Sequence, residues 1–279
     1  MHHVRHSLAV YALHSAQGKF LFAFAALFDY PWFLAVGLFF IIFVALEIGY
    51  RLASRTRVNA DHEKHEQIIS TRDSLLVLLS FVLGFTFAMA LTRYDLRCDL
   101  MVNEANAIRT TSLRARMLSE VQQAELLDLL RQYADSRMEL YAAGLDTTRQ
   151  QAALDRAKQL QDQLWNTSVV ISLHDRSSVF AEFMNSLNQT IDLDVNRRAA
   201  IENRIPVVIW CLIIFVALLT AFSVGYSLHK RFWFAAVVLP LTLSVVIAMI
   251  ADLDAPSSGF TGTGQETISR LQQDLRRNQ

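Results

Sequence analysis

The sequence predicts an all-α integral membrane protein with four transmembrane helices and a helical extramembrane domain between the second and the third. Four stretches of roughly 20 residues carry almost no charge, and this length crosses a hydrocarbon layer about 30 Å thick. Hydrophobic residues make up 53% of the 279 residues, and the formal net charge is zero. A soluble protein would need four helices that are apolar on every face, which a fold of this length rarely contains.

The N-terminal segment, residues 1–30, precedes the first predicted span. Its stretch Lys19–Phe28 is apolar after the first residue but too short to cross a bilayer. We expect a short interfacial or re-entrant helix there. A cleavable signal peptide does not fit, because the polar start is long and no small-x-small cleavage pattern follows.

The predicted spans fall into two pairs, in residues 31–92 and 206–253, and a C-terminal tail follows at 254–279. Aromatic residues such as Trp32 and Trp233 lie near the ends of the spans, where the interfacial belts of membrane helices are found. Pro206 fits the first turn of a helix, where its missing N–H costs nothing. The individual spans are Pro31–Tyr50, Ser74–Thr92, Pro206–Leu228 and Trp233–Leu253.

Residues 93–205 predict the helical extramembrane domain, because apolar residues recur there at helical spacing and are backed by polar ones. No turn signal follows Thr92, and none follows Phe180 before Pro206, so two long helices are expected to leave the membrane as continuous rods. Breaks are expected at Ser119–Gln123, Gly144–Thr148 and His174–Ser178. The apolar stripes are Leu126, Leu129, Leu130, Tyr133, Leu140 and Tyr141; then Leu154, Ala157, Leu160 and Leu164; then Phe180, Met184, Leu187, Ile191 and Val195.

The second span carries a stripe of large apolar residues. Val77, Phe81 and Phe85 follow one another at i, i+4 and i+8, and Met89 extends the line. Such a stripe can face lipid, another helix or the axis of an oligomer. Periodicity does not choose among these three, although apolar residues in a membrane most often face lipid or protein.

Two other pairs in the spans have structural explanations. Gly84 and Ala88 are small residues four apart, which favours the close approach of a neighbouring helix. Glu47 is the one carboxylate well inside a predicted span, where a charge is usually functional. Arg51 lies one turn further on, so a local intramembrane ion pair is the favoured explanation.

No metal site, cofactor site or catalytic site is predicted. His62 and His65 offer nitrogen ligands, but the stretch "DHEKHEQ" is better explained as a solvated loop of mixed charge. Asp252 and Asp254, at the exit of the fourth span, are expected to pair or cap rather than to bind a cation. No nucleophile and base can be placed together, and there is no basic aromatic groove, so neither an enzyme nor a nucleic-acid-binding protein is expected.

Several motifs resemble a known family. "SFVLGF" at Ser80–Phe85, followed by "TRY" at Thr92–Tyr94, resembles the second membrane helix of the bestrophin channels. The stretches "ALEIGYRL", "EANAIRTTSLRA", "LRQYADSRMELY" and "DLDAPSSGF" resemble bacterial membrane proteins described as bestrophin-like. The resemblance to this bacterial group covers most of the chain from about Pro31 onward, whereas the match to bestrophins proper is specific only over the second helix.

The resemblance implies a homopentamer with an anion pore along its five-fold axis, and an inorganic anion such as chloride as the permeant ion. By motif alignment, the hydrophobic neck of that pore falls on Val77, Phe81 and Phe85. Rings of such side chains form an apolar constriction that closes by dewetting. The edges of phenylalanine rings carry the positive end of the quadrupole, which tolerates a passing anion.

Two departures from the bestrophin pattern modify these expectations. Leu78 stands where bestrophins commonly have a proline, so the second helix is expected to be straighter. The acidic calcium-binding run after the fourth helix is reduced to Asp252 and Asp254, so calcium control is not expected.

We therefore expect a bestrophin-like oligomeric ion channel in the lipid of the bacterial plasma membrane, passing anions through an apolar neck. The alternative is a non-conducting membrane scaffold or sensor whose helical domain binds a partner. Four spans place both termini and the large domain on one side. Family topology puts that side in the cytoplasm, whereas the cations of the two short loops favour the reverse orientation. We follow the family topology.

Overall fold

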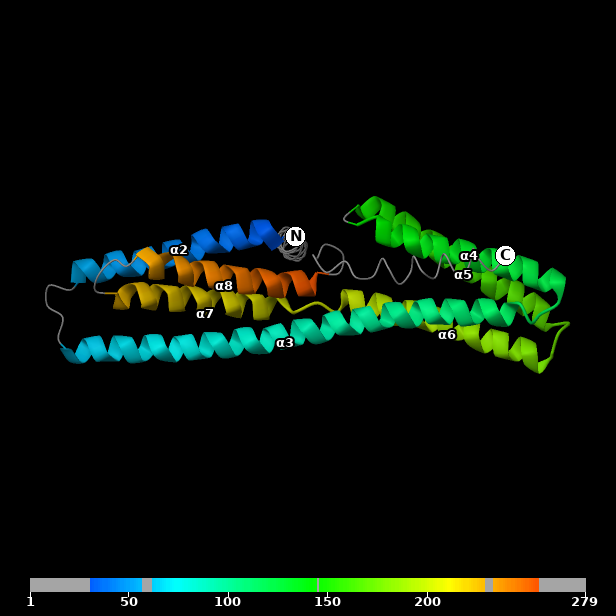
Figure 1. The fold of residues 1–279 in the computed structure, drawn as a ribbon, viewed down its shortest axis with the longest axis horizontal. Helices are drawn as coiled ribbons and strands as arrows, with labels where there is room; N and C mark the ends of the chain where they lie inside the picture. The colour runs from blue at the N-terminus through cyan, green and yellow to red at the C-terminus, as the bar shows by residue number, and fades with distance from the viewer. Residues whose placement is uncertain (1–30, 57–61, 145, 229–232, 256–279) are drawn as a thin grey trace, which may run out of the picture. The chain divides into compact units, whose positions relative to one another are not determined.

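The structure is a computed structural model that describes residues 31–56, 62–144, 146–228 and 233–255. These residues form helices with short connections and no strand, which confirms the predicted all-α class (Figure 1). The segment Lys19–Phe28, expected to form an interfacial helix, lies outside the described residues. The helices are α2 (Pro31–Thr56), α3 (His62–Ala115), α4 (Glu120–Ala142), α5 (Thr147–Ser172), α6 (Ser178–Glu202), α7 (Val207–Ser227) and α8 (Trp233–Asp254).

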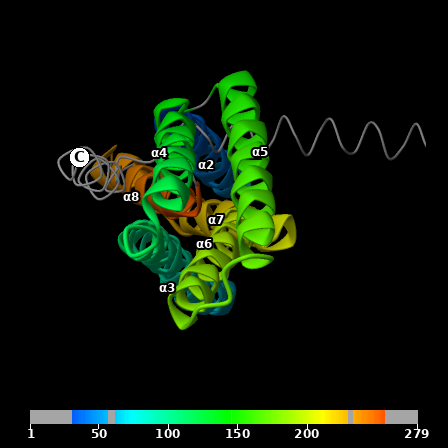
Figure 2. The same cartoon turned by 90° about the vertical axis from the view of Figure 1, so that its right-hand side faces the viewer.

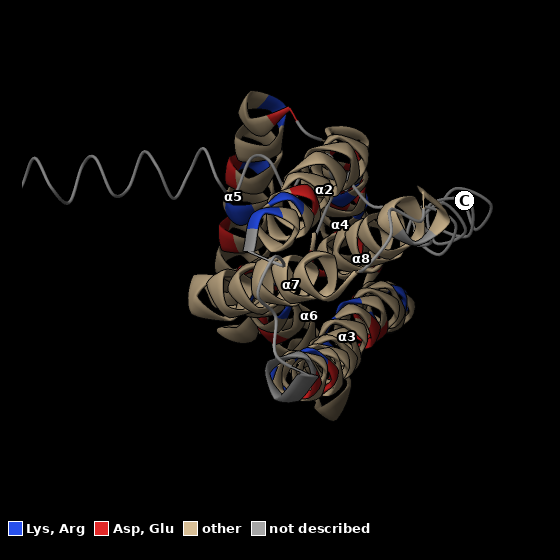
Figure 3. Ribbon diagram, turned by 90° about the vertical axis from the view of Figure 1, so that its left-hand side faces the viewer, with Lys and Arg blue, Asp and Glu red and all other residues tan. Residues whose placement is uncertain are grey.

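The described residues contain four helical stretches that are long and apolar enough to cross a membrane, as the sequence predicts. α7 is an example: no charged residue occurs along it, and its ribbon is tan throughout in Figure 3. The four stretches lie within Trp32–Arg55, Glu66–Ala115, Ser178–Ser227 and Ala236–Asp254.

Residues 31–91 and 205–255 belong to one compact unit, called unit 1 below. In it α2 packs against both α7 and α8, and α7 also contacts α8. The first half of α3 adds its own apolar side chains to the same core. Buried members of this core are Leu38, Ile42, Leu46, Leu79, Leu83, Ile213, Ala217, Leu243 and Ile247.

Two glycines bring the backbones of α2 and α7 together. A Cβ atom added at Gly49 would overlap the carbonyl oxygen of Phe222, and one added at Gly225 would overlap that of Leu46. No larger residue fits at either position unless the helices move apart. The sequence analysis did not single out this pair, because Gly49 and Gly225 stand on helices far apart in the chain.

Residues 92–204 belong to a second compact unit, unit 2, made of the second half of α3 with α4, α5 and α6. α4 and α5 run side by side as a helical hairpin (Figure 2). Gly144, after α4, has a φ of +54°, a conformation that favours glycine. Asp146 then caps α5, because its carboxylate accepts hydrogen bonds from the backbone N–H groups of Thr148 and Arg149.

The predicted apolar stripes supply most of the core of unit 2. Val195, at the end of the third stripe, is exposed, and Leu140 and Leu154 are half-buried outside this core. The side chain of Tyr141 lies outside the described residues. Met184 and Ile191 of the third stripe pack against the core while partly buried. The fully buried members of the three stripes are Leu126, Leu130, Tyr133, Ala157, Leu160, Leu164, Phe180 and Leu187.

The helix breaks lie at or near the predicted positions. α3 continues from the membrane-spanning part to Ala115 as one helix of 54 residues, which confirms the first continuous rod. The second rod is interrupted, because α6 ends at Glu202 and α7 begins at Val207. Pro206 accounts for this gap, since a proline disfavours the helical conformation of the residue before it.

Candidate functional site

The residues predicted to form a pore neck lie on one exposed face of α3. Val77, Phe81 and Phe85 are 70%, 71% and 64% exposed in the single chain. Leu79 and Leu83, on the other side of the helix, are buried in the core of unit 1. The fold of one chain therefore leaves three large apolar side chains of α3 uncovered.

The exposed face continues beyond the neck through Ala88. Ala88 is exposed, whereas Met89, the predicted extension of the neck, is half-buried. Helical geometry explains the difference, since Ala88 lies about 20° around the helix from Phe81 and Met89 about 80°. A Cβ atom added at Gly84 would meet nothing within 4 Å. Within the described residues, no helix comes close to Gly84.

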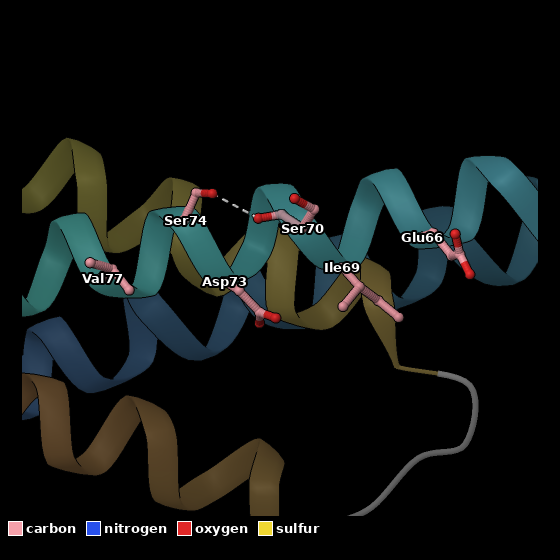
Figure 4. Close-up of a pocket in the computed structure, with 6 residues that line it drawn as sticks. All are labelled: Glu66, Ile69, Ser70, Asp73, Ser74 and Val77. Carbon is pink, nitrogen blue, oxygen red and sulfur yellow. Dashed lines mark hydrogen bonds between the residues drawn. The ribbon is translucent and has the colours of Figure 1, made fainter.

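A shallow pocket precedes the neck on α3. It is lined by residues of this one helix, and Figure 4 shows Ser70 and Ser74 on one side of the ribbon and Ile69 and Asp73 on the other. The hydroxyl group of Ser74 donates a hydrogen bond of 2.9 Å to the carbonyl oxygen of Ser70. Asp73 forms an ion pair of 2.8 Å with Arg72. The lining residues are Glu66, Ile69, Ser70, Asp73, Ser74 and Val77.

Polar residues also follow the neck on the exposed face of α3. Thr92, Asp95, Asp99 and Asn103 are all exposed, and they are spaced three or four residues apart. Residues at this spacing lie above one another on a helix. The apolar neck is thus flanked by hydroxyl, amide and carboxylate groups that water or ions can reach.

The predicted intramembrane pair in α2 is formed within one helix. Arg51 Nε lies 2.9 Å from Glu47 Oε1, with the Glu47 side chain 17% exposed and that of Arg51 72% exposed. The pair satisfies the carboxylate locally, one turn from the end of the apolar stretch.

Asp254 accepts hydrogen bonds from the backbone just before another helix. The backbone N–H of Ile205, just before α7, donates to both carboxylate oxygens of Asp254 at 3.1 and 3.2 Å. A negative charge near the start of a helix is also favoured by the helix dipole. Within the described residues, no group of three His, Cys, Asp or Glu side chains could hold a metal ion. The side chains of His62 and His65 are outside the described part.

Unit 2 contains a buried network of charges that the sequence analysis missed. Its central residues are Glu104 on α3, Arg137 on α4, and Asp194 and Arg197 on α6, with side chains no more than 5% exposed. Buried charges are costly unless each is paired. Here all four are held by ion pairs.

Arg137 is at the centre of this network, between the two carboxylates. Its Nε lies 2.7 Å from Glu104 Oε1, and its Nη1 lies 2.8 Å from Asp194 Oδ1. Arg197 Nη1 contacts the other oxygen of Glu104, and Arg198 Nη2 lies 2.7 Å from Asp194 Oδ2. Positive and negative groups therefore alternate through the network.

Two uncharged side chains complete the network. Gln161 of α5 donates its amide to Asp194 at 3.0 Å and to the hydroxyl of Tyr133 at 3.1 Å. The Tyr133 hydroxyl in turn donates to Glu104 Oε1 at 3.4 Å. Burial and the nearby Glu104 carboxylate raise the pKa of Tyr133, so this hydroxyl keeps its proton.

The Asp194 carboxylate is held in its charged form. Burial alone would raise the pKa of Asp194, but the charges of Arg137 and Arg198 and the hydrogen bond from Gln161 outweigh it. The pKa of Asp194 consequently lies below its ordinary value.

A signal for this network is present in the sequence. Arg137 follows Leu126, Leu130 and Tyr133 at helical spacing, so it occupies the next position of a buried apolar stripe. Asp194 continues the stripe of Leu187 in the same way. A charged residue on the buried side of a helix requires a partner, but the partner is on another helix and spacing does not identify it.

Comparison with known proteins agrees with this fold. A family model described as a bestrophin-like domain matches residues 34–267. No curated protein gives a significant match to the sequence. A variant of a bacterial bestrophin homologue from Klebsiella pneumoniae is similar in structure, with a TM-score of 0.63 and 13% identity, covering 88% of this chain and 98% of that chain.

A second structure of the Klebsiella pneumoniae homologue, solved by Zn-SAD phasing, is similar to the same degree. Its TM-score is 0.61 at 12% identity, and the match covers 87% of this chain and 97% of that chain. At such low identity the structural likeness shows the fold, and the family model carries the relationship.

Proposed function

The chain belongs to the bestrophin-like family, and we propose that it assembles into an oligomeric ion channel, with the ion path along the exposed face of α3. The observation that carries this proposal is the pattern of that face. Large apolar side chains at Val77, Phe81 and Phe85 are uncovered, and exposed polar residues flank them on both sides. The carboxylates nearest the stripe, Asp73 and Asp95, lie just outside the predicted span Ser74–Thr92, where they can meet ions that enter or leave the neck.

In the proposed assembly, the rings of the neck need no charge, because an apolar neck controls the passage of ions through its wetting. Copies of α3, five if the assembly is the pentamer that the family resemblance implies, would surround one axis. Rings of Val77, Phe81 and Phe85 would then form a constriction that empties of water when narrow and conducts when wide. No catalytic chemistry is part of this proposal.

We propose that the permeant ion is an inorganic anion such as chloride, which the resemblance to bestrophins implies. One specific observation favours a second candidate, a path for cations. Asp95 and Asp99 are exposed beyond the neck on the same face, and rings of carboxylates are typical of cation channels. The reversal potential under a salt gradient distinguishes the two candidates by its sign.

The test is a conductance measurement on the purified protein in lipid bilayers. Replacing Phe81 and Phe85 together by alanine should widen the neck and increase the current, because less apolar surface then opposes wetting. Phe40→Ala is the matched control, since Phe40 is an exposed phenylalanine on α2 and should not affect the current. Absence of current in the native chain and in the double variant would favour the non-conducting scaffold.

We further propose that the protein lies in the bacterial plasma membrane with unit 2 in the cytoplasm. The apolar helices support a membrane location, and the family resemblance supports this orientation.

A further inference from the structure

The buried network of unit 2 is a poor source of stability for its size. Charges that leave water lose their hydration, and replacing a buried ion pair by apolar residues is often neutral or stabilising. The best-attested role of such groups is to fix how helices align. Side chains from α3, α4, α5 and α6 all take part here, so the network selects one arrangement of these helices.

Glu104 is the contribution of α3 to this network. Arg137 of α4 contacts one oxygen of its carboxylate, and Arg197 of α6 contacts the other. Two further polar contacts hold the same part of α3: the hydroxyls of Thr111 and Thr190 lie 3.0 Å apart, and Arg114 pairs with Glu182. Of these contacts of α3, the one at Thr111 is buried but uncharged, and the Arg114 pair is partly exposed. The contacts of Glu104 are both buried and charged.

Glu104 and the exposed polar residues of α3 lie on different sides of the helix. Asp99 and Asn103 lie about 100° to 140° around the helix from Glu104, and both are exposed. A rotation by one residue would bring Asn103 or Ala105 to the place of Glu104. Both Arg137 and Arg197 would then lose the Glu104 carboxylate, and Arg137 would keep only its pair with Asp194 among the two carboxylates of the network.

We propose that Glu104 is a positioning residue that sets the rotation of α3 in unit 2, and thereby keeps Asp99 and Asn103 on the exposed face. This inference rests on the proposed function for its importance, because that face is the one assigned to the ions. Its test does not require a current.

The test measures how fast single cysteines react with a water-soluble maleimide in the full chain, reconstituted in vesicles. Cys98 and Cys211 are first replaced by serine. Cysteines placed at Asn103, which is exposed, and at Ser112, which is buried, should react at clearly different rates in the native background. Glu104→Gln should remove this difference, because the buried charged contact that fixes the rotation of α3 is then lost.

Asp194→Asn is the matched control. It removes the other buried carboxylate of the network from α6 and leaves Glu104 in place, so the rate difference between Asn103→Cys and Ser112→Cys should persist. Glu104→Asp keeps the charge on a shorter side chain and should reduce the difference even if Glu104→Gln does not fold. An unchanged difference in the Glu104 variants, or an equal loss in Asp194→Asn, overturns the inference.

The proposed function can fail separately from this inference. If Asn103→Cys is protected from the reagent in the native background, the face does not line a water-filled path, whatever Glu104 does. If Asn103→Cys reacts quickly in the native background, the proposed path stands. If the Glu104 variants then show the same rate difference as the native chain, the positioning role is wrong.

Discussion

Asp194 illustrates how a side chain retains its charge away from water in this protein. Two arginines and a glutamine surround its oxygens, and their effect on the pKa exceeds that of burial. The folded state therefore stabilises the ionised carboxylate of Asp194 more than the unfolded state does. The resulting contribution to stability is present above the ordinary aspartate pKa of about 3.9 and is lost as the pH falls through the lower pKa of the folded state.

We predict that Asp194→Asn lowers the stability of the protein at neutral pH, since breaking a buried ion pair costs about 3 to 5 kcal/mol. The difference from the native chain should shrink as the pH is lowered through and below about 3.9, because the native carboxylate then becomes protonated too. Thermal unfolding of the detergent-solubilised protein at several pH values measures this. A difference that stays constant down to the lowest pH would show that charge is not the cause.

For single residues, helical spacing predicted the shared apolar face of α3 but not the buried ion pairs of unit 2. The shared face of Val77, Phe81 and Phe85 follows from helical spacing within one element, and the structure places all three on an exposed face. The partners of Glu104 are Arg137 and Arg197, on two other helices. Such contacts depend on how helices pack, and spacing along one helix does not contain that information.

The helices of unit 1 meet most closely where glycine replaces a side chain. Gly49→Ala should push α2 away from α7 and lower the temperature of unfolding, because the added Cβ would overlap a backbone carbonyl. Gly37→Ala is the control on the same helix, since a Cβ there meets nothing within 4 Å. The control should be neutral or stabilising by up to about 1 kcal/mol. Equal effects of both substitutions would exclude close packing as the cause.

The helices of unit 2 depend on their caps. Asp146→Ala should destabilise α5 by about 1 kcal/mol, because the N–H groups of Thr148 and Arg149 lose their acceptor. Asp162→Ala, at an exposed position inside the same helix, serves as the control and should have little effect. Chemical denaturation followed by circular dichroism measures both changes. A larger loss in the control would contradict the capping role.

Helix breaks were predictable because they depend on local residues such as Gly144, Ser177 and Pro206. The interruption between α6 and α7 shows the limit of this approach. Pro206 predicted the end of a helix, but four residues, 203–206, leave the helical conformation. The carboxylate of Asp254 satisfies the free N–H of Ile205 in this gap, and that contact comes from the far end of α8.

The described part of the chain crosses the membrane an even number of times if each of its four apolar stretches spans it. We predict that tags at the two termini, and a protease site placed at the exposed Arg149 of unit 2, all lie on one side. Protease treatment of sealed vesicles of known orientation tests this. Termini on opposite sides would mean that one apolar stretch does not cross the membrane.

The class of the whole fold was predictable, since it follows from the length and charge of the apolar stretches and from motifs that resemble the bestrophins. The packing of α2 against α7 and α8 was not, because every face of these helices is apolar and hydropathy does not mark the buried side. Gly49 and Gly225 do lie on the sides of α2 and α7 that face each other, but this becomes clear only when the two helices are placed next to one another.

The close approach of α2 and α7 at Gly49 and Gly225 has a consequence for the synthesis of the protein. The ribosome adds about 5 to 20 residues per second, so α7 emerges on the order of ten to thirty seconds after α2. During that interval the first helix must reside in lipid without its later neighbours. The carboxylate of Glu47 is already neutralised at that stage, because Arg51 belongs to the same helix. The nascent chain can therefore insert its first segment independently of the order in which the others arrive.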